Sequence, residues 1–291
     1  MACGSAGGRA VSEWHAANQI IRPESTPSSF ARRRLGEPCR AIDMETGMGH
    51  PIAEIYRRGF GLVVALPWLL AMPAAAEFAQ HGAEILLGMY GPGGMPSGGE
   101  TVRLKFGIVK IVSIFVVLLV ALRWWRFDGD MHRAIRPTWA MARGLVIVLT
   151  VQLGGEALTL LTGTELAAMV GAFGPRARFA TLITPLLVWL FAAGLLFPWY
   201  VGLLTEDRTM GLRRSVRATR SQLPAVFGCL LGGVLPLMIA HYAIGYGSMG
   251  RAAPLVWSLM AIDAAIVALL AAMLAASYFT IYRRAAERQP F

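Results

Sequence analysis

Six long apolar segments constrain the fold more than any other feature of this sequence. Each is long enough for the ~20 residues that a helix needs to cross a hydrocarbon core of ~30 Å. Among the 291 residues, 56% are hydrophobic and 15% are charged, whereas soluble domains have about 45–50% and about 25%. The sequence therefore predicts an all-α integral membrane protein with six transmembrane helices. The predicted spans cover residues 59–78, 106–124, 144–161, 179–204, 223–244 and 253–281.

Basic residues are concentrated in alternate connections between these spans. The basic segments precede the first span and follow the second, fourth and sixth, whereas the other connections hold few arginines or lysines. Because positive loops are retained in the cytoplasm, this alternation predicts a multi-pass protein of the bacterial inner membrane with both termini cytoplasmic. We expect the segments 131–143 and 209–222 to lie amphipathically on the membrane surface.

The net charge of +10 follows from these loops and is no sign of nucleic-acid binding. We expect the partners to be the lipid bilayer and anionic lipid head groups, with no nucleic acid. A homo-oligomer or a membrane-protein partner stays open. The arginines expected to contact anionic lipid are Arg133, Arg136, Arg143, Arg213, Arg214, Arg217 and Arg220.

The first 47 residues differ from the rest of the chain. They are polar, contain several prolines and lack an apolar core of signal-peptide length. We expect either a disordered leader or a true translation start at Met44 or Met48. Residues 48–291 then form the six-span membrane domain.

Two of the predicted hairpins resemble each other. Glu77 near the end of the first span corresponds to Glu156 in the third, and each is followed by a short apolar stretch that begins with glutamate and ends with Gly-Pro. These stretches begin at Glu84 and Glu165. The spacing predicts tandem helical hairpins that share one orientation, which is a parallel repeat.

Ionisable residues inside the spans are the best indicators of function, because each costs several kcal/mol (~2.5–3.5 on insertion scales) unless it is paired or hydrated. They lie at the predicted midplane or on its outer side. One interpretation is structural: Lys110 neutralises a carboxylate of the third or sixth span, and His241 lies at the interface. The other is an outward-facing polar cavity, lined by three carboxylates, that relays cations or protons. The five residues are Glu77, Lys110, Glu156, His241 and Asp263.

Motifs of membrane-bound enzymes are missing from the sequence. There is no His-Glu-x-x-His zinc pair, and the Gly-Ser-Met-Gly stretch at 247–250 lacks the first glycine of a nucleophile elbow. We therefore predict no catalytic residue, metal site or cofactor. The first functional hypothesis is a non-catalytic membrane protein that binds lipid or a partner. The alternative is a small transporter or channel that uses Glu77, Glu156 and Asp263, and a lipid-modifying enzyme comes third.

Overall fold

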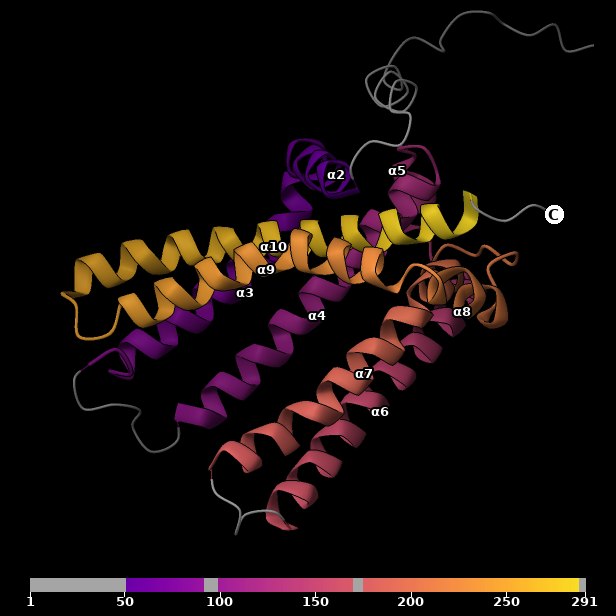
Figure 1. Cartoon of the computed structure of the whole chain (residues 1–291). Helices are drawn as coiled ribbons and strands as arrows, with labels where there is room; N and C mark the ends of the chain where they lie inside the picture. The colour runs from indigo at the N-terminus through magenta and orange to yellow at the C-terminus, as the bar shows by residue number, and fades with distance from the viewer. Residues whose placement is uncertain (1–50, 92–98, 170–174, 288–291) are drawn as a thin grey trace, which may run out of the picture.

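The computed structural model describes residues 51–91, 99–169 and 175–287, and helices are the only regular secondary structure in these ranges. The predicted leader lies outside them, as do Pro92 and Gly174 of the two Gly-Pro endings. Figure 1 shows the arrangement of the helices. In chain order they are α2 (Pro51–Ala65), α3 (Pro67–Leu86), α4 (Gly99–Arg126), α5 (Met131–Ile135), α6 (Trp139–Met169), α7 (Pro175–Leu204), α8 (Leu212–Arg220), α9 (Leu223–Gly247) and α10 (Ala253–Glu287).

Five of these helices are long and apolar enough to cross a membrane. They are α4, α6, α7, α9 and α10, and the bent pair α2–α3 makes a sixth when it is counted as one span. The prediction of a multi-pass, all-α membrane protein is thereby confirmed. The tandem repeat stays a prediction.

The first predicted span, residues 59–78, is divided between two helices at Pro67. The chain bends by 94° between α2 and α3. Pro67 has no N–H to donate, and its ring disfavours helical backbone at the residue before it. Leu66 accordingly adopts φ −135° and ψ 56°. With its 20 residues, α3 alone has the ~30 Å length of a membrane crossing.

The two predicted surface segments form different structures. The stretch 131–143 is not one helix, because Pro137 holds Arg136 in extended backbone and separates α5 from α6. The stretch 209–222 contains α8, which buries Ser215, Ala218 and Thr219. Three of its four arginines are exposed.

The longest helix, α10, lies at the centre of the bundle and packs against α2, α3, α4, α7, α8 and α9. Small residues permit these close approaches. A Cβ on Gly59 of α2 would overlap the side chain of Met273, and one on Gly233 of α9 would lie 2.5 Å from Ser277 Oγ. Asp263 of α10 is completely buried and so does not face lipid, where a charge would be costly.

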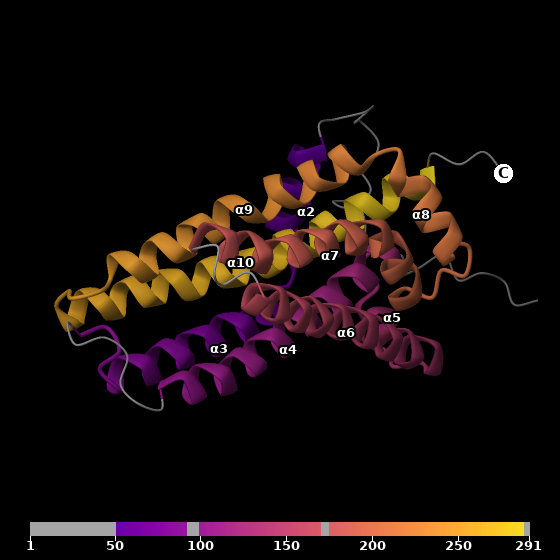
Figure 2. The ribbon, with the colours of Figure 1, turned by 60° about the horizontal axis from the view of Figure 1, so that its bottom comes forward.

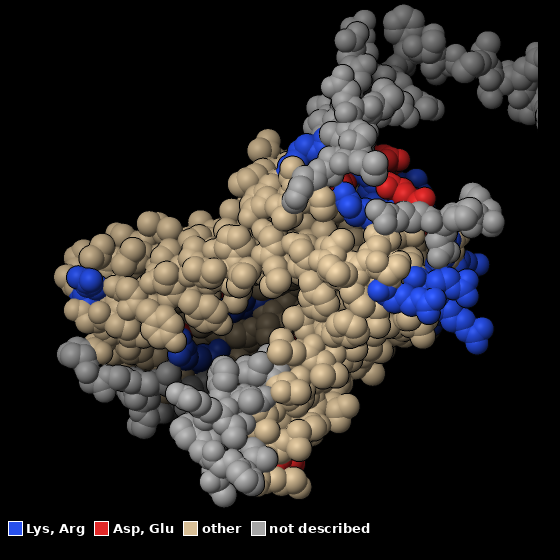
Figure 3. Space-filling view, in the orientation of Figure 1, with Lys and Arg blue, Asp and Glu red and all other residues tan. Residues whose placement is uncertain are grey.

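Helices α6 and α7 form a hairpin that packs closely side by side (Figures 1 and 2). A Cβ on Gly144 would lie 2.6 Å from the carbonyl oxygen of Leu203, and one on Gly155 would overlap the ring of Trp189. Helix α6 contacts the rest of the bundle much less than α7 does. A hollow is visible between this hairpin and the α3–α4 side of the molecule (Figure 3).

Arg123 joins the ends of several elements at the basic end of the molecule. The residue is 1% exposed, and its side chain donates hydrogen bonds to the carbonyl oxygens of Ala134, Leu204, Arg133 and Arg136. Its Nη1 also lies 2.7 Å from Glu206 Oε1. One guanidinium therefore joins α4, the α5 region and the end of α7.

Candidate intramembrane polar site

One face of α3 carries a row of polar side chains inside the bundle. Glu77, Gln80, His81 and Glu84 follow the i, i+3, i+4, i+7 spacing that places residues on one side of a helix. All four are buried. This face packs against α10 and α4, so the polar row meets polar groups from those helices.

His81 lies at the centre of the row and contacts all three buried carboxylates. Its Nε2 is 2.8 Å from Asp263 Oδ2 and 3.2 Å from Glu77 Oε1, and its Nδ1 is 3.1 Å from Glu84 Oε2. The hydroxyl of Tyr90 lies 2.8 Å from the same Nδ1. Because both ring nitrogens face acceptors, these surroundings favour the imidazolium form, in which both nitrogens donate.

Glu84 is held by groups from three segments. The Tyr90 hydroxyl donates to Oε2 at 2.7 Å, and Gln80 Nε2 and Arg103 Nε donate to Oε1 at 3.0 Å and 2.7 Å. Burial, together with the contact with Glu84, raises the pKa of the Tyr90 hydroxyl, which therefore stays protonated. Glu84 thus has donors on both oxygens.

Glu77 is paired less completely. Lys110 Nζ lies 2.7 Å from Oε2, and His81 Nε2 lies 3.2 Å from Oε1. Neither oxygen accepts a well-directed hydrogen bond from the described residues, although the side chain is fully buried. We read these contacts as ion pairs. The negative charge of Glu77 is thus balanced by Lys110 and His81, but its oxygens lack directed hydrogen bonds.

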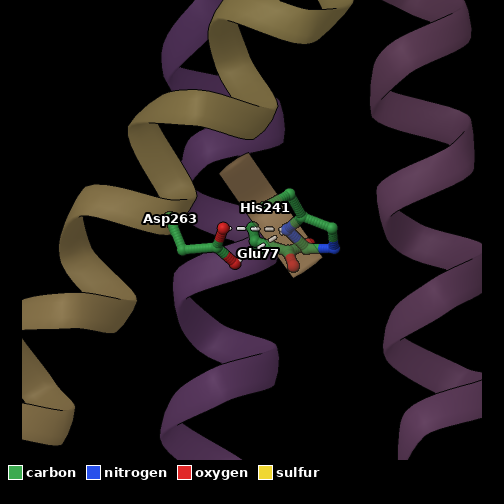
Figure 4. A group of neighbouring side chains, drawn as sticks. All are labelled: Glu77, His241 and Asp263. Carbon is green, nitrogen blue, oxygen red and sulfur yellow. Dashed lines mark hydrogen bonds and ion pairs between the residues drawn. The ribbon is translucent and has the colours of Figure 1, made fainter. Parts of the chain in front are cut away.

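Asp263 brings the last span to the site. Its Oδ1 and Oδ2 lie 2.8 Å and 2.9 Å from His241 Nδ1 of α9. Figure 4 shows Glu77, His241 and Asp263 converging from α3, α9 and α10. One ligand atom from each of the three lies within 4.8 Å of the others, so these side chains could hold a metal ion.

The charges of the site nearly balance. Three carboxylates face Lys110, Arg103 and the imidazoles of His81 and His241, so one protonated imidazole is enough for neutrality. Only His241, Lys110 and Arg103 have side chains that are appreciably exposed among these ionisable groups, at 20%, 21% and 47%. The carboxylates and His81 are enclosed, whereas Lys110, Arg103 and His241 reach the surface.

The site lies toward the end opposite Arg123. Glu77, Lys110, His241 and Asp263 are ~9–16 Å along their helices from the ends that meet there, at 1.5 Å per residue. The two connections at that end are joined by a backbone hydrogen bond of 2.9 Å from Gly250 N to Tyr90 O. The residues therefore share one level of the bundle.

The structure brings together four of the five predicted ionisable residues and leaves out Glu156. Its side chain is exposed on α6 and accepts a hydrogen bond from Gln152. The expected pairing of Lys110 with Glu156 or Asp263 is wrong. Helix α6, which carries Glu156, packs on α7 and away from α4, and Asp263 is paired with His81 and His241. Lys110 therefore meets Glu77, and His241 pairs with Asp263 instead of standing alone at the interface.

Sequence reasoning missed the residues that complete the network. They lie beyond the predicted end of the first span at residue 78, in a stretch that was treated as an outer loop. The i, i+4, i+7 spacing of Glu77, His81 and Glu84 could have extended that helix by two turns. The missed residues are Gln80, His81, Glu84, Tyr90 and Arg103.

No protein-family model matches this chain, and neither the curated proteins nor the solved structures include a match to it.

Proposed function

We propose that this protein is a small cation transporter of the bacterial inner membrane, with Glu77, Asp263 and His241 at its binding site. The observation that carries the proposal is the burial of three carboxylates, Glu77, Glu84 and Asp263, within helices of membrane-spanning length. Burying charge in a membrane is costly, and such groups are typical of ion pathways. Apolar residues of similar volume would stabilise a bundle as well or better.

The pairing of Glu77 supports a binding role for the site. A purely structural carboxylate is normally satisfied by several directed hydrogen bonds, as Glu84 is. Glu77 has ion pairs only, and its main partner, Lys110, ends a flexible side chain with partial exposure. A cation arriving from outside can therefore compete with the ammonium for the carboxylate.

The position of the site supports entry from the outer side. The arginine-rich connections at the opposite end favour a cytoplasmic location for that end, which sets the site nearer the periplasm. The site is then an outward-facing one, formed by Glu77 and Asp263 without Glu156.

Flux in proteoliposomes tests the proposal. The purified protein should carry cations across the bilayer, with K⁺, Na⁺, protons and divalent ions each measured by an ion-sensitive dye. Asp263→Asn and Glu77→Gln should abolish flux. Glu156→Gln makes the same chemical change at the exposed site on α6 and should leave it intact. Absence of flux for every ion, with folded protein in the bilayer, would refute the transporter.

Lipid binding at the arginine end is a second candidate function, favoured by the exposure of six of the seven arginines that were expected to contact lipid. Lys and Arg side chains gather on this end in Figure 3. Each basic residue near an anionic surface contributes about 1 kcal/mol. Anionic lipid should raise the apparent Tm of the detergent-solubilised protein more than zwitterionic lipid does, and neutralising the group should remove the difference. The group comprises Arg133, Arg136, Arg143, Arg213, Arg217 and Arg220.

A further inference from the structure

We infer that Glu77, His241 and Asp263 bind a divalent first-row transition-metal ion, of which Zn²⁺ and Co²⁺ are the probes of choice. The inference rests on the proposed transporter only in treating this ion as the transported cation. Binding of the metal itself can be measured without any transport.

The geometry provides the first argument. One oxygen of each carboxylate and one ring nitrogen of His241 lie within 4.8 Å of each other. The three residues come from α3, α9 and α10, and both α3 and α9 pack against α10. A metal ion of this class has ligand distances of ~2.0–2.2 Å, so a small inward shift of these side chains closes the site around it.

The donor set decides the class of metal. One imidazole nitrogen with two carboxylate oxygens suits Zn²⁺, Co²⁺ and similar ions better than Mg²⁺ or Ca²⁺, which prefer oxygen ligands alone. The set contains no thiolate, since Cys229, the single cysteine in the described ranges, pairs with none of these residues. Soft monovalent ions are therefore disfavoured.

Unfilled ligand capacity is the second, independent argument. The fully buried oxygens of Glu77 accept no directed hydrogen bond within the part of the chain that the structure describes. His241 turns Nδ1 toward Asp263, whereas its Nε2 points away from the two carboxylates (Figure 4), so a metal would use Nδ1, with the ring proton on Nε2. The site thus has oxygen and nitrogen lone pairs that a metal can use.

Lys110 occupies the position of a competing cation. Its ammonium lies 2.7 Å from Glu77 Oε2, and its side chain is 21% exposed, so it can withdraw toward the surface when a metal enters. His81 Nε2, 2.8 Å from Asp263 Oδ2 and 3.2 Å from Glu77 Oε1, contacts and orients both carboxylates, as groups next to metal ligands commonly do. When the metal ion replaces the ammonium, two positive charges take the place of one. The charge of the buried site therefore rises by one unit and not by two.

Titration of the detergent-solubilised, full-length protein with Co²⁺ tests the site. The d–d absorption of bound Co²⁺ reports coordination, and calorimetry with Zn²⁺ reports affinity. We expect one ion per chain in the wild type. Glu77→Gln, Asp263→Asn and His241→Gln should each weaken binding by more than the ~10–100-fold that loss of an outer-shell partner costs. The matched control Glu156→Gln should bind as the wild type does.

Lys110→Met gives a result that mere misfolding cannot imitate. Without the ammonium, Co²⁺ should bind about tenfold tighter or more, and should raise the apparent Tm further than in the wild type. Weaker binding in this variant would overturn the role of Lys110. Absence of a stoichiometric ion in both wild type and Lys110→Met would overturn the site.

The two proposals fail in different ways. Flux of another cation that depends on Asp263, with no Co²⁺ or Zn²⁺ binding, refutes the metal assignment and leaves the transporter standing. Stoichiometric Co²⁺ binding that depends on Glu77 and His241, with no flux of any cation, refutes the transporter and leaves a structural metal site.

Discussion

The ammonium of Lys110 on α4 lies 2.7 Å from a carboxylate oxygen of Glu77 on α3, and that carboxylate is completely shielded from the surroundings of the protein. This contact joins two neighbouring spans across the bundle. Its energetics differ from those of a surface pair, because each charge has lost its hydration and depends on the other.

Removing only one of the two charges of this pair should lower the stability of the protein. Lys110→Met leaves Glu77 buried with His81 as its remaining partner and, in the absence of added metal, should destabilise the protein by about 3–5 kcal/mol. The double variant Lys110→Met, Glu77→Gln removes both charges and should recover much of the loss. Thermal unfolding in detergent measures all three proteins, and a double variant no more stable than the single one would contradict the pairing.

Arg123 should be the most sensitive arginine at the basic end. Arg123→Ala removes donors from four carbonyl oxygens and from Glu206, and should cost at least ~3 kcal/mol, because buried acceptors lose their partners. Arg126→Ala, an exposed position three residues later, serves as the control and should change stability by no more than ~0.5 kcal/mol. Equal Tm shifts in the two variants would argue against the buried role of Arg123.

The Arg123–Glu206 contact should make stability depend on pH. The Arg123 guanidinium beside Glu206 lowers the pKa of that carboxyl below its usual range. A carboxylate with a lowered folded-state pKa stabilises the protein above its unfolded value of about 4.3, and this stabilisation is lost as the pH falls through the folded-state pKa. The Tm difference between wild type and Glu206→Gln should therefore be present at pH 6–7 and shrink below about pH 4. A difference that does not change with pH would refute the coupling.

The α6–α7 hairpin should tolerate no side chain at Gly155. A Cβ there overlaps the ring of Trp189, so Gly155→Ala should separate the helices and lower the apparent Tm. Its neighbour Gly154 has open space around it and offers a matched control. Gly154→Ala should be neutral or should stabilise α6 by up to ~1 kcal/mol through helix propensity. If Gly154→Ala lowers the Tm more than Gly155→Ala does, the close contact between α6 and α7 does not lie at Gly155.

Reporter fusions test the predicted orientation. A reporter that is active only in the cytoplasm should work when fused after Arg126 or Arg208 and should fail when fused after Ser248, because the arginine-rich ends are retained inside. Activity at Ser248 together with inactivity at Arg208 would invert the topology and place the polar site near the cytoplasm.

Much of the architecture followed from the sequence. Hydropathy located the later spans to within several residues of α4, α6, α7, α9 and α10, because a membrane demands continuous apolar length and internally bonded backbone. Burial of Asp263 followed from the cost of charge in lipid. The sequence shows a proline at residue 67, which is expected to interrupt a helix. The 94° angle of the bend, however, depends on how α2 packs against α9 and α10.

What the sequence by itself determined is the class of protein and which residues are too polar to face lipid. Which of these residues meet was decided only by the tertiary structure. The sequence favoured Glu156 or Asp263 as the partner of Lys110. Because α4 lies on α3 whereas α6 lies on α7, Lys110 meets Glu77 instead. The ligand set of Glu77, His241 and Asp263 is assembled from helices separated by up to 186 positions in the chain, and periodicity within one helix carries no information about such contacts.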